Sequence, residues 1–117
     1  MNQISTLSEK NSFVIDSLID LLLTQKIKNI KVLKLESDQF HDNVIICTAN
    51  SLIQMGSIIK NIRKNLQIHK FTYEGENSNW LLISVKGILI HIFTEESREY
   101  YNIEDIYFDS ETLYQYG

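Results

Sequence analysis

Residues 80–93 read WLLISVKGILIHIF. Two apolar runs, WLLIS and ILIHIF, are separated only by Val85, Lys86 and Gly87. So short a link joins two strands as an antiparallel hairpin. This hairpin is therefore expected to form part of the sheet of the protein, and the other elements can be placed around it.

Three further strands are expected before the hairpin. IKVLKL at 30–35 and NVIICT at 43–48 flank a polar loop, and IHKFTY occupies 68–73. The second of these runs is apolar nearly throughout, which is typical of a central strand buried on both faces. The expected sheet therefore has five strands.

Two helices are expected to flank that sheet. The first spans 7–26, where Thr6 and Glu9 fit a capping box and apolar residues recur at helical spacing, in an arc wide enough to leave some surface for a second subunit. The second begins at Ser51, which fits a capping box with Gln54. This helix joins the second and third expected strands and so permits a parallel crossover between them. A short helical turn near 95–101 and a less regular tail complete the chain.

Composition is that of a globular protein without a disulfide framework. The chain has 117 residues, no proline and a single cysteine, Cys47. No apolar run approaches the length of a membrane span, and the N-terminus lacks the basic start and apolar stretch of a signal peptide. We therefore expect one cytoplasmic α/β domain over 1–117, with a mixed five-stranded sheet flanked by helices.

Charge is unevenly distributed along the chain. Residues 1–94 carry ten basic and eight acidic side chains, whereas residues 95–117 carry seven acidic side chains and one basic, Arg98. Such an acidic segment repels phosphate and is attracted to a basic protein surface. Alternatively, the acidic segment is a terminus exposed to solvent that binds no partner.

The second helix carries the basic residues Lys60, Arg63 and Lys64. They lie in its C-terminal half, where they complement the helix dipole. No aromatic residue is interleaved with them in the sequence, so a nucleic-acid patch is not favoured here.

No catalytic, metal-binding or cofactor-binding constellation is predicted. The four glycines are far apart, and the three histidines lie on different elements. Cys47 lies in an apolar strand, which favours a small core side chain over a nucleophile. An arginine beside Glu95 and Glu99 would hold these carboxylates ionised, which does not suit general acid catalysis.

The segment that follows the hairpin resembles a known family. HIFTEESREYYNIE at 91–104 looks like the signature of the Iojap-related ribosomal silencing factors, a VHIF strand end followed by an acidic turn and REYYDLE. HDNVIICTANS at 41–51 resembles the family's ADYFVIATGNS, and Trp80 stands where the family opens a strand with tryptophan. The similarity runs from about residue 14 to 108. Tyr107 replaces a tryptophan of the family pattern.

The resemblance implies a binding protein and not an enzyme. It implies a fold similar to that of nucleotidyltransferases, without their catalytic acids, and members often occur as homodimers. The family binds the large ribosomal subunit at its protein fourteen, on the face that meets the small subunit, so that its bulk prevents subunit joining and silences translation. No sequence-specific nucleic acid, membrane or cofactor is implied.

The docking face expected from this resemblance is formed or supported by seven residues: Trp80, His91, Arg98, Glu99, Tyr100, Tyr101 and Glu104. One of the two tyrosines is expected to be the buried anchor, since tyrosine dominates binding hot spots. Glu99 or Glu104 is expected to steer a cationic partner. An alternative role for Arg98 is to hold the patch together by pairing with Glu95.

Two other functions remain open on the sequence. A small nucleotide-binding enzyme of the nucleotidyltransferase type needs a Gly-Ser pair at a helix start and a D-x-D pair for magnesium. Asn50 and Ser51 echo the former only loosely, and no D-x-D occurs. A homodimeric scaffold is the second alternative, and it would bury the tyrosines between protomers.

Overall fold

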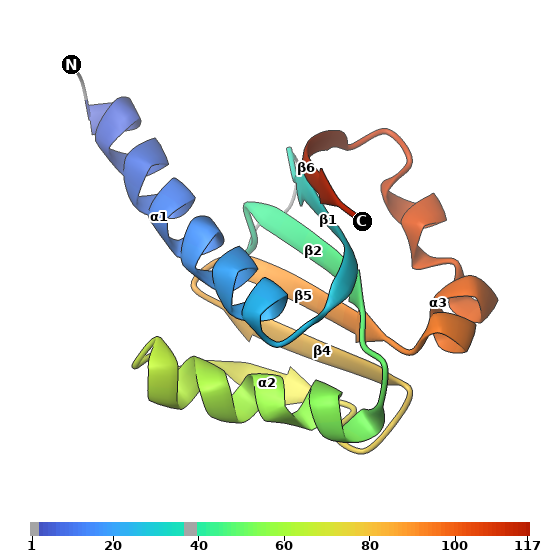
Figure 1. The fold of residues 1–117 in the computed structure, drawn as a ribbon. Coiled ribbons are helices and arrows are strands. Elements are labelled where there is room, and N and C mark those ends of the chain that lie inside the picture. The colour runs from blue at the N-terminus through green and yellow to red at the C-terminus, as the bar shows by residue number, and fades with distance from the viewer. Residues whose placement is uncertain (1–2, 37–39) are drawn as a thin grey trace.

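The computed structural model describes the backbone of residues 3–36 and 40–117, and the side chains of these residues from Phe13 onward (Figure 1). One mixed sheet of six strands runs in the order β3-β4-β5-β2-β1-β6. The strands are β1 (Lys28–Lys34), β2 (Asn43–Thr48), β3 (Thr72–Glu74), β4 (Trp80–Val85), β5 (Ile88–Phe93) and β6 (Glu111–Tyr116). The helices are α1 (Gln3–Thr24), α2 (Leu52–Asn65), α3 (Glu95–Tyr101) and the 3-10 helix η1 (Ile103–Tyr107).

The predicted hairpin is confirmed and lies within the sheet. β4 and β5 pair antiparallel from Trp80↔Phe93 to Val85↔Ile88. The two residues between them, Lys86 and Gly87, both have positive φ, at 50° and 76°. Two residues with positive φ form the tight turn whose twist matches that of the flanking strands. β5 in turn pairs parallel with β2, so β2 is central as expected.

The expected irregular tail is wrong, because β6 adds a sixth strand. β6 pairs antiparallel with β1, from Ile30↔Tyr116 to Lys34↔Glu111. All six of its residues are exposed, so its sequence carries no buried alternation that would have marked it as a strand. Edge pairing of the backbone, not side-chain burial, places it in the sheet.

Three predicted boundaries also differ from the structure. α1 spans Gln3–Thr24 instead of the expected 7–26, and the side chains of Thr6 and Glu9, expected to form its capping box, lie outside the described part of the structure. The strand expected at 68–73 is the short β3, Thr72–Glu74, and the strand expected at 30–35 is Lys28–Lys34. The cap of α2 is confirmed, since the Ser51 hydroxyl accepts a hydrogen bond from the backbone N–H of Gln54 at 3.1 Å.

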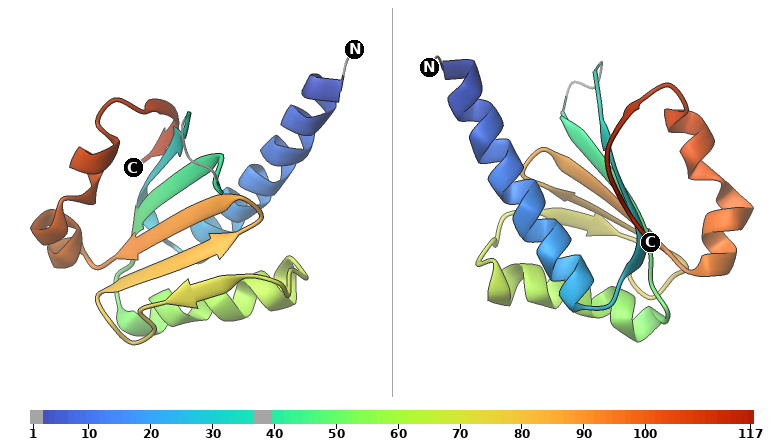
Figure 2. Two further views of the ribbon diagram at one scale, coloured as in Figure 1. Left: turned by 180° about the vertical axis from the view of Figure 1, so that it is seen from behind. Right: turned by 45° about the horizontal axis from the view of Figure 1, so that its top comes forward.

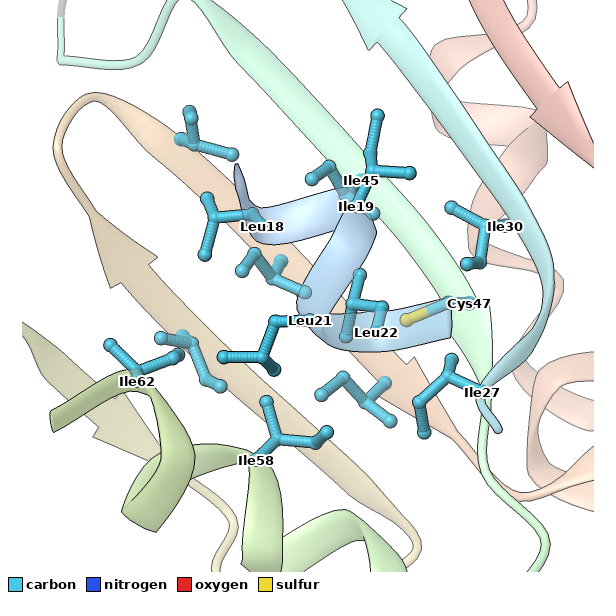
Figure 3. Close-up of a cluster of buried hydrophobic side chains, with 14 of the residues drawn as sticks. Leu18, Ile19, Leu21, Leu22, Ile27, Ile30, Ile45, Cys47, Ile58 and Ile62 are labelled. Atoms are coloured by element: carbon cyan, nitrogen blue, oxygen red, sulfur yellow. The ribbon is translucent and has the colours of Figure 1, made fainter. Parts of the chain in front are cut away.

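One face of the sheet is covered by α1 and α2, and the main core lies there (Figures 1 and 3). Leu18 and Leu22 of α1 and Ile58 and Ile62 of α2 point toward the strands (Figure 3) and are fully buried. Cys47 of β2 lies among them, as predicted. The core of this layer is apolar.

The opposite face of the sheet is covered only in part, by α3 and η1 (Figure 2). Its smaller core joins Leu33, Val44, Ile46 and Phe93 of the strands to Ile103 of η1. Trp80 and Tyr107 are partly buried against this cluster. The sequence signature at 91–104 therefore runs from the sheet onto the helices that cover this second face.

Candidate partner-docking face

Five aromatic rings gather on the second face of the sheet, and we call this group the ring cluster: Trp80, His91, Phe93, Tyr101 and Tyr107. Strand register brings the first three together, because Trp80 pairs with Phe93 and the neighbouring Leu82 pairs with His91. The other two come from α3 and η1. The cluster thus depends on the path of the chain after β5.

Two local signals set that path. The Thr94 hydroxyl caps α3 by accepting from the backbone N–H of Ser97 at 3.3 Å. Asn102 ends α3 in the left-handed conformation, with φ of 47°, which asparagine tolerates better than most residues. The chain therefore reverses after α3, and η1 brings Tyr107 back over His91.

The rings of Trp80 and Tyr101 connect the strands to α3. The centroid of Trp80 lies 5.1 Å from that of Phe93 and 5.0 Å from that of Tyr101. Tyr100 meets Tyr101 edge to face, at 5.0 Å and 89°. These are favourable geometries for aromatic pairs. The two tyrosines are thus held on a platform of rigid rings.

His91 is the buried centre of the ring cluster and is only 4% exposed. The indole N–H of Trp80 donates to its Nδ1 at 3.1 Å, and its Nε2 lies 3.2 Å from the Tyr107 hydroxyl oxygen. Because an indole nitrogen can only donate, Nδ1 must accept, and Nε2 then carries the proton and donates to Tyr107. Burial lowers the pKa of His91 from 6.5 to about 4, so the ring is neutral at physiological pH.

Arg98 joins α3 to η1 and to the sheet. Its Nε donates to Glu104 Oε1 at 2.7 Å, and its Nη1 donates to Thr48 Oγ1 at 3.0 Å and to the backbone oxygen of Asn29. The expected pairing of Arg98 with Glu95 is therefore wrong. Lys31 adds a second cation 3.8 Å from Glu104. Arg98 and Glu104 thus hold the platform in place.

The sequence is similar to that of a known protein family. The family model described as "Ribosomal silencing factor during starvation" matches residues 8–115. The chain belongs to this family. A ribosomal silencing factor of Halalkalibacterium halodurans is 33% identical over 89 residues, which is 73% of each chain.

Other ribosomal silencing factors and solved structures are also similar. The factor of Haemophilus influenzae is 30% identical over 70 residues, 56% of this chain and 69% of the relative. A Bacillus halodurans crystal structure has a TM-score of 0.68, 24% identity, and coverage of 81% of this chain and 93% of its own. A Chromobacterium violaceum crystal structure has a TM-score of 0.72 and 22% identity, and the match covers 81% of this chain and 83% of that one. These two structures share the fold with this member of the silencing factor family.

The seven residues expected at the docking face of this silencing factor divide by exposure. Glu99, Tyr100 and Tyr101 are exposed, the tyrosines by 82% and 50%. Trp80 is half-buried and His91 buried, and the Arg98–Glu104 pair is partly buried. Of the seven, only the first three are therefore exposed, and the other four are partly or fully buried.

Two exposed apolar residues in and after η1 were not predicted. Ile106 of η1 is 67% exposed and Phe108, which follows it, is 84% exposed. Both interrupt the acidic tail, and exposed apolar side chains in a charged segment are the sequence signal that could have marked them. They add two exposed apolar side chains to the C-terminal segment that also carries the two tyrosines.

A hollow of about 470 Å³ lies beside the two tyrosines. Asn79 and Ser97 line it together with Glu96, Tyr100 and Tyr101. The Ser97 hydroxyl donates to the backbone oxygen of Asn79 at 2.6 Å, which joins the start of α3 to the loop before β4. A carboxylate and two rings around a hollow form a suitable receptor for a lysine or arginine side chain.

Two kinds of reactive group, a thiol and metal ligands, are relevant to chemistry in the described part of the chain. Burial raises the pKa of the Cys47 thiol to about 12, so it is not a thiolate nucleophile. Within the ranges that the structure describes, no three His, Cys, Asp or Glu side chains converge as metal ligands. Among the described helices, none is both long and apolar enough to cross a bilayer.

Proposed function

We propose that this protein binds the large ribosomal subunit in the cytoplasm and blocks joining of the small subunit, so that it represses translation. Membership of the ribosomal silencing factor family supports a ribosomal role. The observation that carries the proposed docking site is the pair Tyr100–Tyr101, exposed on a rigid ring cluster beside acidic residues of α3. Protein fourteen of the large subunit, implied by the sequence resemblance, is the proposed contact.

The chemistry of the surface supports a cationic protein as the partner. Glu95 and Glu96 lie in the first turn of α3, and Glu99 lies one turn further along. Carboxylates near a helix N-terminus interact favourably with the helix dipole. Such charges accelerate encounter with a basic surface, while the tyrosines contribute most of the binding energy.

A steric mechanism requires size and attachment but no catalysis. The molecule measures 44 × 34 × 25 Å along its principal axes. A body of this size, bound where two large particles meet, prevents the contacts between them. We therefore propose that the protein acts as a binding factor and not as an enzyme.

Co-sedimentation with purified large subunits tests the docking face. We expect Tyr100→Ala to weaken binding at least tenfold, because truncation of a central tyrosine costs about 2 kcal/mol. Since Tyr100 is 82% exposed, the variant should fold normally, which circular dichroism checks. Glu99→Lys is expected to reduce the association rate.

Two outcomes contradict the proposal. Undiminished pelleting of Tyr100→Ala, Tyr101→Ala and Glu99→Lys would move the interface elsewhere. Free pairing of ribosomal subunits on a sucrose gradient, at saturating protein, would exclude the blocking mechanism. Glu104→Lys is a poor probe, because it also breaks the ion pair with Arg98.

A further inference from the structure

A second concave surface lies on the other side of the sheet, between α2 and the β3 edge. This groove has a volume of about 550 Å³. Lys60, Arg63 and Lys64 of α2 line it, with His69 from the connection to β3 and Tyr73 from β3 itself. Glu76 is the one carboxylate among its described lining residues. The groove is thus a basic site, separate from the acidic docking face.

The cations of this groove are available to a ligand. Lys60, Arg63 and Lys64 are all exposed, and they recur at helical spacing on one side of α2. None of the three takes part in an ion pair with another side chain of residues 13–36 and 40–117. The helix dipole explains why basic residues lie in the last turn of α2, but it does not explain the aromatic rings that lie beside them.

Aromatic rings from β3 and the residue before it face Arg63, one of these cations. The guanidinium carbon of Arg63 lies 5.2 Å from the ring centroid of Phe71 and 5.8 Å from that of Tyr73. Both rings are only half-buried. These rings lie apart from the basic residues of α2 in the sequence, but the fold brings them next to Arg63. Cations combined with partly exposed rings are the usual platform for single-stranded nucleic acid.

The groove and the docking face meet at one loop. Glu76 and Asn77 line the groove, whereas Asn79 lines the hollow beside Tyr100 and Tyr101. A partner that presents basic protein next to RNA can therefore contact both surfaces at once. The ribosome has this composition, and so the choice of RNA over a free nucleotide rests on the proposed function.

We propose that the groove between α2 and β3 binds a segment of single-stranded RNA, without reading its sequence. Lys60, Arg63 and Lys64 contact successive phosphates, and Tyr73 stacks on a base. The docking face selects the protein partner, and the groove adds a contact with RNA beside it.

Fluorescence anisotropy with a labelled RNA of uridines tests this site without the ribosome. Three phosphate contacts predict that the logarithm of the association constant falls with the logarithm of salt concentration with a slope of about −2. Lys60→Glu combined with Lys64→Glu is expected to weaken binding at least tenfold. The matched control, Lys26→Glu combined with Lys86→Glu, has the same net charge but alters exposed lysines outside the groove, and it should lose far less.

Gly56→Leu tests the groove without changing charge. A Cβ at Gly56 meets no atom within 4 Å and Gly56 lines the groove, so a larger side chain can be added there to narrow it. We expect weaker RNA binding from this variant and from Tyr73→Leu, and unchanged binding from Tyr100→Ala. Equal affinity of the charge-reversed pair and its control would overturn the proposal. Uridine triphosphate that binds as tightly as the RNA would overturn the assignment to RNA, and neither result bears on ribosome docking.

Discussion

The Nε of Arg98 lies 2.7 Å from Oε1 of Glu104, and this ion pair joins α3 to η1 beneath the proposed docking surface. The same guanidinium donates a hydrogen bond to the side chain of Thr48 in β2 and another to the backbone oxygen of Asn29 in β1. One side chain thus ties the C-terminal segment to the sheet at several points. Because α3 also carries the exposed tyrosines, we expect their position to depend on it.

Replacement of Arg98 should destabilise the protein. Arg98→Met leaves the partly buried carboxylate of Glu104 without its closest cation and removes hydrogen bonds of a charged group, so we expect a loss of about 2 kcal/mol in the free energy of unfolding. Urea denaturation measures it. Glu95→Gln is the control, since Glu95 is exposed and is not the partner of Arg98, and an equal urea midpoint for both variants would refute the structural role.

Acidification should destabilise the protein through His91. The pKa is about 4 in the folded state against 6.5 for an ordinary histidine, so the unfolded chain binds more protons between these two values. Stability is therefore complete above the higher value and falls as the pH drops toward the lower one, by about 2 kcal/mol between pH 7 and pH 5.

Comparison of variants isolates this contribution from that of the carboxylates. His91→Phe should lack the His91 part of the pH dependence, whereas His69→Gln, at an exposed position, should keep it. Thermal unfolding over the same pH range measures both. A wild-type curve parallel to that of His91→Phe would contradict the buried neutral imidazole.

Substitution by alanine should change the stability of the protein in opposite directions at two glycines. Gly75 has φ of +87°, and a Cβ there would collide with the carbonyl oxygen of Trp80, so Gly75→Ala is expected to cost at least about 2 kcal/mol. Gly56 lies inside α2 with open space around it, so Gly56→Ala should stabilise by about 1 kcal/mol through helix propensity. Chemical denaturation measures both, and a neutral Gly75→Ala would contradict the tight turn before β4.

Cys47 should resist thiol reagents until the protein unfolds. A pKa of about 12 instead of 9.0 reduces the thiolate fraction about 1000-fold at neutral pH, and the side chain has no exposed surface. A colorimetric disulfide reagent should therefore react only after denaturant is added. Glu99→Cys supplies an exposed thiol as the positive control, and fast reaction of wild-type protein without denaturant would exclude this burial.

Local patterns in the sequence determined much of the fold. Two apolar runs around Lys86–Gly87 specified the β4–β5 hairpin, and Ser51 with Gln54 specified the start of α2, because turns and caps depend on neighbouring residues. The motif at 91–104 likewise indicated the family from sequence alone. Exposure within that motif was not readable, since it depends on which elements cover each residue.

Only the tertiary structure decided the rest. β6 is a strand because β1 offers it an edge, and Arg98 pairs with Glu104 and not with Glu95 because η1 folds back past α3. Arg63 meets Phe71 and Tyr73 because α2 packs against the β3 edge. Such contacts join residues that lie apart in the chain, and their energies depend on packing that no local spacing contains.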